Sequence, residues 1–357
     1  MAFFPANRVG AVNSDTTIPA AAAFATASGI GSWPGTAPRE AAAVVVGELG
    51  GALAHLVELP ARGIGADLLG RAGALLVDLA LDTVPRGYRL IARPGAVTRR
   101  AISMLGEDMD ALEEAWEKAG LRGAGRTVKV AAPGPITLAA GLELPNGHRA
   151  ITDPGAIRDL TASLAEGVAI HRSSLERRLD ARVVVQFDEP MMPASLAGTL
   201  TGVTALSPVA ALDDDVALGM LDTCVSVVDT GVVVHSCAAD LPWKLLQRST
   251  IDALSVDAHA LQAGDLEALA EFVDSGRTVM LGVVPVTAPA RRPSAEQVAQ
   301  DIVAVTDRLG FGRSALRHWI GVTPGCGLAG STVEWARKAI ELTRTAAEAF
   351  AEDPEAI

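Results

Sequence analysis

One short segment of the sequence places two zinc-type ligands two residues apart. His235 and Cys237 follow a run of three valines at positions 232–234. On an extended strand alternate side chains share a face, so these two can point in the same direction. Imidazole nitrogen and thiolate sulfur are ligands that zinc prefers. Taken alone, the pair is better explained as a neutral histidine and an inert buried thiol, so a metal site requires further ligands from elsewhere in the chain.

The composition limits the classes of function. The 357 residues carry a net charge of −12, which disfavours nucleic acid and anionic membranes as partners. The three cysteines, Cys224, Cys237 and Cys326, are too few and odd in number for a disulfide framework, so free thiols in a reducing compartment are expected. Cys224 lies in a helical pattern and is expected in the core. No long uncharged apolar run is present, and a soluble cytoplasmic protein is predicted.

The elements that must position these residues alternate between apolar runs and amphipathic stretches. This alternation predicts an α/β fold with a parallel sheet covered by helices. Eight such units favour a closed (β/α)8 TIM barrel over a long open sheet. We expect one domain over residues 23–357 after a loosely ordered extension at 1–22, with an insertion between the second and third core strands. The predicted strands cover residues 24–30, 54–59, 126–132, 182–187, 231–235, 251–256, 277–284 and 317–322.

Two helical stretches carry further expectations. Residues 66–81 have a helical pattern. Residues 159–179 are predicted to form a long charged helix, and His171 within it is expected to be exposed.

The predicted barrel brings further zinc-type ligands to one rim, because active sites of such barrels lie at the carboxyl ends of the strands. The fifth strand ends with His235 and Cys237, and Cys326 follows the eighth. The sixth strand ends in Asp257, and His259 lies just beyond it. One histidine, two cysteines and either Asp257 or His259 would complete a tetrahedral zinc site.

Polar residues at the ends of other strands are candidates for substrate binding. Glu58 ends the second strand and Asp188 ends the fourth, so two carboxylates could hold an ammonium group. Alternatively, one of Asp188 and Glu189 caps the next helix and the other pairs with an arginine. Ser32 follows the first strand, either in a tight turn or as a donor to a carboxylate.

Five short motifs occur in the order found in the catalytic barrel of cobalamin-independent methionine synthase. They are Ile30-Gly31-Ser32-Trp33-Pro34, Gly134-Pro135-Ile136-Thr137, Gln186-Phe187-Asp188-Glu189-Pro190, His235-Ser236-Cys237 and Gly325-Cys326-Gly327. Over residues 24–345 the chain resembles a short, single-barrel form of this family. The resemblance implies a methyltransferase that activates a thiol, with homocysteine as acceptor.

The resemblance also implies roles for individual residues. Zinc would be bound by His235, Cys237 and Cys326, and Asp257 stands where the family has a glutamate as fourth ligand. The amino-acid part of homocysteine would be held by Ser32, Glu58 and Asp188.

Two departures from the family concern the methyl donor. Residues 284–289 lack the Asp-x-His motif used in methyl transfer, and residues 138–143 replace a segment that helps hold folate. The donor is therefore open: methyltetrahydrofolate, a corrinoid protein or a small methylated metabolite. Other possibilities are transfer to a different thiol, as in coenzyme M relatives, and a non-catalytic zinc-containing barrel. A uroporphyrinogen decarboxylase-like enzyme would need rim arginines that this chain lacks.

Overall fold

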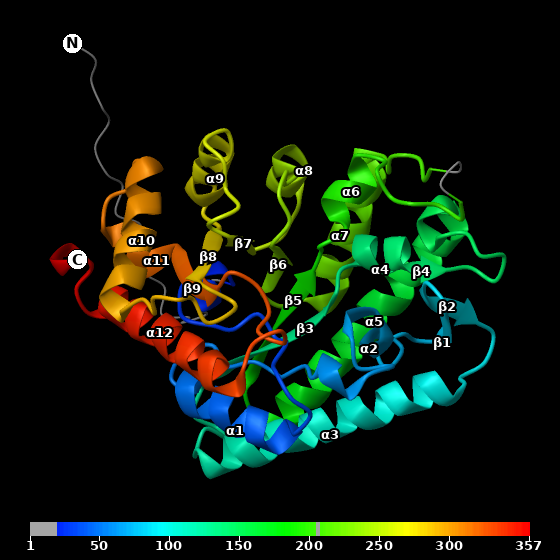
Figure 1. Ribbon diagram of the computed structural model, residues 1–357, viewed down its shortest axis with the longest axis horizontal. Helices are drawn as coiled ribbons and strands as arrows, with labels where there is room; N and C mark the ends of the chain where they lie inside the picture. Colours follow the sequence, from blue (N-terminus) through cyan, green and yellow to red (C-terminus); the bar gives the residue numbers. More distant parts are fainter. Residues whose placement is uncertain (1–19, 205–207) are drawn as a thin grey trace, which may run out of the picture.

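A six-stranded parallel sheet curls into half a barrel at the centre of the computed structural model, which describes residues 20–204 and 208–357 (Figure 1). Residues 1–19 of the predicted N-terminal extension lie outside the described residues. The strand order follows the chain: β3 (Thr127–Pro133), β5 (Arg182–Asp188), β6 (Val232–Ser236), β7 (Ala253–Asp257), β8 (Thr278–Val284) and β9 (Ile320–Pro324). These strands confirm the last six of the eight predicted strands, with boundaries shifted by up to three residues.

The inner side of the curled sheet changes from apolar to polar along the strands. Val184, Val233, Ala253 and Met280 form a small apolar cluster separate from the main core. Because alternate residues of a strand share a face, the residues two and four positions further along also lie on this inner side. The inner side therefore becomes polar toward the carboxyl ends of the strands, where the predicted site residues lie.

Helices surround the sheet (Figure 1), with α1 against α3 and α12, and α5 against α7. The helices are α1 (Pro38–Leu49), α2 (Leu68–Ala72), α3 (Ala96–Lys118), α4 (Pro135–Gly141), α5 (Pro154–Leu179), α6 (Met192–Leu196), α7 (Asp214–Val228), α8 (Trp243–Arg248), α9 (Asp265–Asp274), α10 (Ala295–Arg308), α11 (Ser314–His318) and α12 (Val333–Glu352). Short 3-10 helices are η1 (Ala21–Phe24), η2 (Pro60–Arg62), η3 (Ala150–Thr152) and η4 (Pro354–Ala356). Within the described ranges, none of the helices meets the length and hydropathy needed to span a membrane.

The first two predicted strands, 24–30 and 54–59, do not form continuous strands. They contribute isolated parallel bridges that run from β9 to β3: Ala27 with Val322, Ser28 with Leu53, and His55 with Lys129. A further parallel bridge joins Ser32 with Glu58 just beyond Gly31, whose φ of 150° lies in a region that favours glycine. Between β9 and β3, the described residues therefore continue the sheet only by single bridged residue pairs.

The predicted helix over 66–81 was wrong for most of its length. Only α2 is helical, and residues from Ala80 onward form β1 (Ala80–Val84), which pairs with β2 (Gly87–Ile91) in an antiparallel hairpin. The other side of β2 pairs with β4 (Leu142–Glu143), which completes a small three-stranded sheet. At Ala80 and Leu81, pairing with β2 outweighs the helical periodicity of the segment.

The expectation that His171 is exposed was also wrong. Its side chain is 7% exposed on α5, in line with the fully buried Leu164, Val168 and Leu175. These positions follow the helical spacing i, i+4, i+7 and i+11 and form one buried face of the helix. The many charged residues on its other faces led to the wrong prediction.

Candidate active site

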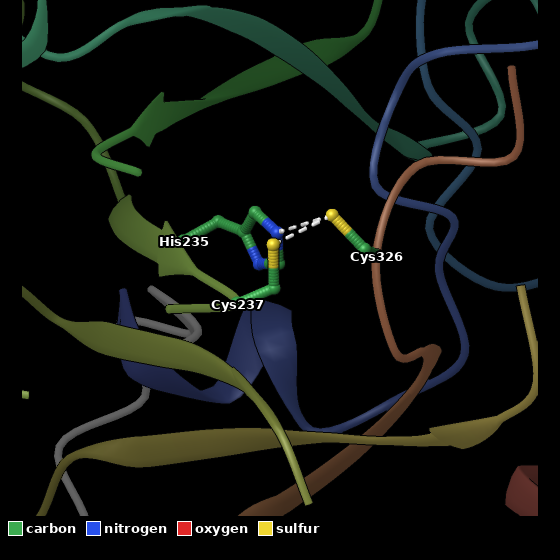
Figure 2. Close-up of side chains that lie close together, drawn as sticks. All are labelled: His235, Cys237 and Cys326. Atoms are coloured by element: carbon green, nitrogen blue, oxygen red, sulfur yellow. Dashed lines mark hydrogen bonds between the residues drawn. The ribbon is translucent and has the colours of Figure 1, made fainter. Parts of the chain in front are cut away.

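Three of the predicted zinc ligands converge at one end of the sheet. The donor atoms of His235, Cys237 and Cys326 lie within 4.8 Å of one another. The two Sγ atoms are 2.8 Å apart, and Sγ of Cys326 is 3.8 Å from Nε2 of His235. Figure 2 shows both sulfurs near the same ring nitrogen, with Cys326 reaching in from the loop after β9. The convergence brings together residues from strands that are not adjacent in the sequence.

The imidazole of His235 is oriented by a neighbouring strand. His235 is paired in register with Ser255 of β7, and its Nδ1 lies 3.1 Å from Ser255 Oγ. This hydrogen bond leaves Nε2 directed toward Cys326. Metal-binding histidines commonly use their second ring nitrogen in this way, which fixes the ring orientation.

The donor set fits zinc in its chemistry. One imidazole nitrogen and two sulfurs supply three of the four ligands of a tetrahedral site. With zinc–sulfur bonds of about 2.3 Å, two sulfur ligands lie roughly 3.8 Å apart. The sulfurs of Cys237 and Cys326 would therefore have to separate by roughly 1 Å, which rotation of the two side chains can provide.

The close contact of the two thiols separates their pKa values. It lowers the pKa of Cys237 to about 7 and raises that of Cys326 to about 12, because one sulfur accepts the hydrogen bond that the other donates. The anionic sulfur of such a pair is the form that binds a metal ion.

A cavity of about 300 Å³ extends from the sulfurs and contains the predicted carboxylates. Its volume is at the lower end of the range for small-molecule sites. Glu58 and Asp188 line it together with Ser32 and the three zinc-type ligands, and Pro60, Ala66, Leu68 and Pro190 add apolar surface. The cavity therefore joins a metal-binding end to an acidic part within one small space.

Behind the cavity wall, Glu58 contacts a buried ion-pair network. Arg71 Nε lies 3.4 Å from Glu58 Oε1, and Arg71 also pairs with Asp108 at 2.7 Å. Asp108 is fully buried and holds Arg62 at 2.7 Å as well. Burial raises the pKa of Glu58 to about 7, against the opposing effect of Arg71. The network thus keeps the Glu58 carboxylate in place in a region where its charge is costly.

Asp188 and the adjacent Glu189 have different surroundings. Asp188 lines the cavity and accepts a 2.7 Å hydrogen bond from Gln186 Nε2. Burial raises the pKa of Asp188, whereas the nearby charge of His235 lowers it. Glu189 accepts hydrogen bonds from the backbone nitrogens of Ile136 and Thr137 at the start of α4. The capping role predicted as an alternative therefore belongs to Glu189, but the capped helix is α4, which lies earlier in the chain, and not the next helix.

Ser32 is fixed between two other segments of the site. It forms a bridge with Glu58, and its carbonyl accepts a hydrogen bond from Leu328 N. A Cβ at Gly327 would lie 2.0 Å from Ser32 Oγ, so any larger residue there would displace the Ser32 hydroxyl. The close approach brings the loop that carries Cys326 against the cavity wall.

The predicted fourth zinc ligand lies apart from the other three. Within the described ranges, the group of donor atoms found within 4.8 Å contains only His235, Cys237 and Cys326. Asp257 ends β7, and its Oδ1 accepts a hydrogen bond from the backbone nitrogen of His259. The assignment of Asp257 as fourth ligand stays a prediction.

A larger cavity lies away from these residues. It has a volume of about 630 Å³ between α5 and α7 and is lined by mainly apolar side chains, such as Ile157 and Met220. We place the site in the smaller cavity because it alone of the two contains the zinc-type ligands and the buried carboxylates.

The sequence was compared with models of known families. Residues 24–349 match the catalytic domain of cobalamin-independent synthase. The chain belongs to this family. The predicted resemblance is thus confirmed, and so is the prediction of a methyltransferase.

Solved structures similar to this cobalamin-independent synthase domain share its fold at low identity. A B12-independent methionine synthase from Shewanella sp. W3-18-1, in complex with selenomethionine, has a TM-score of 0.60 and 15% identity, covering 94% of this chain and all of that one. A methyltransferase from Methanosarcina mazei has a TM-score of 0.54 and 16% identity, covering 91% and 92% of the two chains. No curated protein matches.

Several residues that support the site of this synthase domain were not predicted. Ser255, Arg71 and Lys129 hold or neighbour the predicted residues without reaching the rim themselves. Two features of the sequence could have identified two of them. Ser255 precedes Asp257 by two positions and so lies on the same strand face, and Lys129 is a lone charge in an apolar strand.

Proposed function

We propose that the chain transfers a methyl group to the thiol of homocysteine, with zinc held by His235, Cys237 and Cys326. The observation that carries this proposal is the convergence of these three donors in a cavity that also contains two buried carboxylates. When bound, zinc would lower the pKa of an acceptor thiol from about 8.5, so that its sulfur is nucleophilic at neutral pH. We propose Asp257 as the fourth ligand, replacing the family glutamate.

Glu58 and Asp188 would bind the ammonium group of the acceptor. Oε1 of Glu58 is buried beside Arg71 Nε at 3.4 Å, so the other carboxylate oxygen, Oε2, would accept the hydrogen bond from the ammonium. An ammonium between Glu58 and Asp188 would favour their charged forms, which burial disfavours. Ser32 would bind the acceptor carboxylate. The Shewanella neighbour in complex with selenomethionine, a methionine analogue, supports an amino-acid ligand.

The methyl donor is proposed to differ from methyltetrahydrofolate, because the sequence departs from the family at residues 138–143 and 284–289. A corrinoid protein and a small methylated metabolite are the two other classes. Assays of homocysteine methylation with each of the three donors separate them. Replacing homocysteine with coenzyme M in the same assays tests the alternative acceptor.

Metal analysis and X-ray absorption at the zinc edge test the site. We expect one zinc per chain and a new zinc–sulfur contact when homocysteine is added. If the zinc has four protein ligands and its coordination does not change when homocysteine is added, the zinc is structural. A purified protein that binds no zinc would overturn the proposed chemistry altogether.

The proposal includes the frame that carries the site. We infer that the segments at Ala27–Ser28 and Leu53–His55 act as the first two strands and close the sheet into an eight-stranded barrel, as the single bridges support. The elements between His55 and β3 would then form the predicted insertion. Residues 23–357 would act as one catalytic unit, and a cytoplasmic location remains a prediction.

A further inference from the structure

A buried lysine lies on the inner side of the sheet. The side chain of Lys129 on β3 is fully buried, although lysine is almost never buried without a partner. Its Nζ donates hydrogen bonds to the carbonyl of Gly29 at 2.5 Å and to Oε1 of Gln186. Lys129 does not line the cavity, so it reaches the site only through its partners.

Gln186 connects this lysine to the cavity. Its Nε2 donates to Asp188 Oδ1 and to the carbonyl of Ile30, both at 2.7 Å. An ammonium can only donate hydrogen bonds, so Lys129 can bond only to the amide oxygen of Gln186 and not to its amide nitrogen. The amide nitrogen must then face Asp188. Without Lys129 the amide oxygen would lose its charged donor, and only the Asp188 carboxylate and the Ile30 carbonyl on the nitrogen side would hold the amide.

The charge of Lys129 also matters to the two carboxylates. Burial lowers the pKa of Lys129 to about 7, whereas Asp188 and Glu58 act in the opposite direction and favour its charged form. In turn, Lys129 favours the charged form of Asp188. These groups therefore support one another's ionisation in a region that disfavours single charges.

We propose that Lys129 is a positioning residue that acts through Gln186 to hold Asp188 toward the cavity, and so selects thiols that carry an ammonium group. The inference rests on the proposed function, because it assigns to Asp188 the ammonium of the acceptor. It adds a selectivity device formed by Lys129, Gln186 and Asp188 below the site.

The test compares two thiols that differ in the amino group. Zinc-loaded protein is titrated by calorimetry with homocysteine and with 4-mercaptobutanoate, which keeps the thiol and the carboxylate. Lys129→Met keeps most of the length of the side chain without its charge. We expect this variant to bind homocysteine on the order of 10-fold more weakly, with 4-mercaptobutanoate little affected and zinc content unchanged.

Further variants separate positioning from a structural role. Gln186→Glu keeps an acceptor for Lys129 but offers no donor to Asp188, so it should give the same selective loss even if Lys129→Met folds poorly. In an Asp188→Asn background, Lys129→Met should add little further loss, because both act on one contact. Thr323→Val, a buried substitution on β9, is the control and should bind both thiols like wild type.

The outcomes are distinct. If the lysine variant loses both thiols equally, or its loss adds fully to that of Asp188→Asn, the positioning role is overturned while the proposed function stands. If wild-type protein with bound zinc takes up neither thiol, the proposed function fails and the selectivity inference fails with it.

Discussion

The Sγ atoms of Cys237 and Cys326 lie 2.8 Å apart, although the two residues are 89 positions apart in the sequence. Cys237 follows β6 and Cys326 follows β9, and these two strands are not neighbours in the sheet because β7 and β8 lie between them. Only the curl of the sheet brings the two sulfurs together. Both should therefore be needed for a metal ion, and the residues that orient the histidine beside them should matter as well.

Loss of one sulfur should remove most of the zinc. We expect Cys326→Ser to weaken zinc binding by on the order of 100-fold or more, because an anionic sulfur ligand is replaced by a weakly acidic hydroxyl. Methyl transfer should fall with it. Zinc is measured by elemental analysis after dialysis against a competing chelator. Cys224→Ala, in the core of α7, serves as the control and should keep its zinc; full zinc content in Cys326→Ser would sink the assignment.

Removal of the histidine's hydroxyl partner should have a smaller effect. Ser255→Ala takes away the group 3.1 Å from His235 Nδ1, so we expect zinc affinity to fall by about 10- to 100-fold. Competition with a zinc chelator measures this change. Ser249→Ala is the control. It removes another buried hydroxyl, which donates a hydrogen bond to the carbonyl of Leu246 in α8 and not to His235, so zinc affinity should be unchanged. Equal affinities of the two variants would contradict the orienting role of Ser255.

The buried network behind Glu58 should contribute strongly to stability. Asp108→Asn leaves Arg62 and Arg71 without their shared carboxylate, and we expect the free energy of unfolding to drop by about 3 kcal/mol. Denaturant unfolding of the zinc-loaded protein measures the change. Asp110→Asn breaks the exposed contact with Arg178 and should cost less than about 1 kcal/mol. A loss as small at Asp108 would mean that the buried arginines find other partners.

Buried His171 should make the protein sensitive to acid. Burial lowers its pKa from 6.5 to about 3, with the positive charge of Arg71 adding to the effect. Below pH 6.5 the unfolded chain binds a proton that the folded chain does not, so stability falls as the pH drops from about 6.5 toward about 3.

His171→Gln removes the group that binds this proton, so the difference in bound protons between the unfolded and folded chain disappears at this position. Between pH 6.5 and 5, wild type should lose about 1.6 kcal/mol more unfolding free energy than the variant. The slope approaches about 1.4 kcal/mol per pH unit only well below pH 6.5, where the unfolded histidine is fully protonated. Any loss of zinc in acid affects both proteins and cancels in the difference. Parallel pH profiles would show that His171 is protonated in the folded protein.

Much of the fold followed from patterns in the sequence. The last six core strands are apolar runs long enough to be buried on both faces, and each is followed by a helical stretch. The helix predicted over 66–81 was wrong because the helical period is only local. The chain leaves the helix after α2, and Ala80 and Leu81 already pair with β2, which lies further along the chain. His171 failed for the opposite reason, since its buried stripe was present in the spacing but masked by neighbouring charges.

Patterns in the sequence were enough to predict at which end of the sheet the candidate site residues lie. His235, Cys237 and Asp188 lie at or just after the ends of parallel strands, and such strands all end at the same edge. The family motifs could be recognised for the same reason, because they mark these strand ends.

Which of these residues come into contact depends on how the whole chain folds. The approach of Cys326 depends on the path of the loop after β9, and the Asp257 carboxylate lies outside the donor group despite its strand-end position. The partners below the rim, Ser255 and Lys129, act through contacts between neighbouring strands. Distances across a curled sheet and the burial of charge depend on all strands at once, and no local pattern in the chain specifies them.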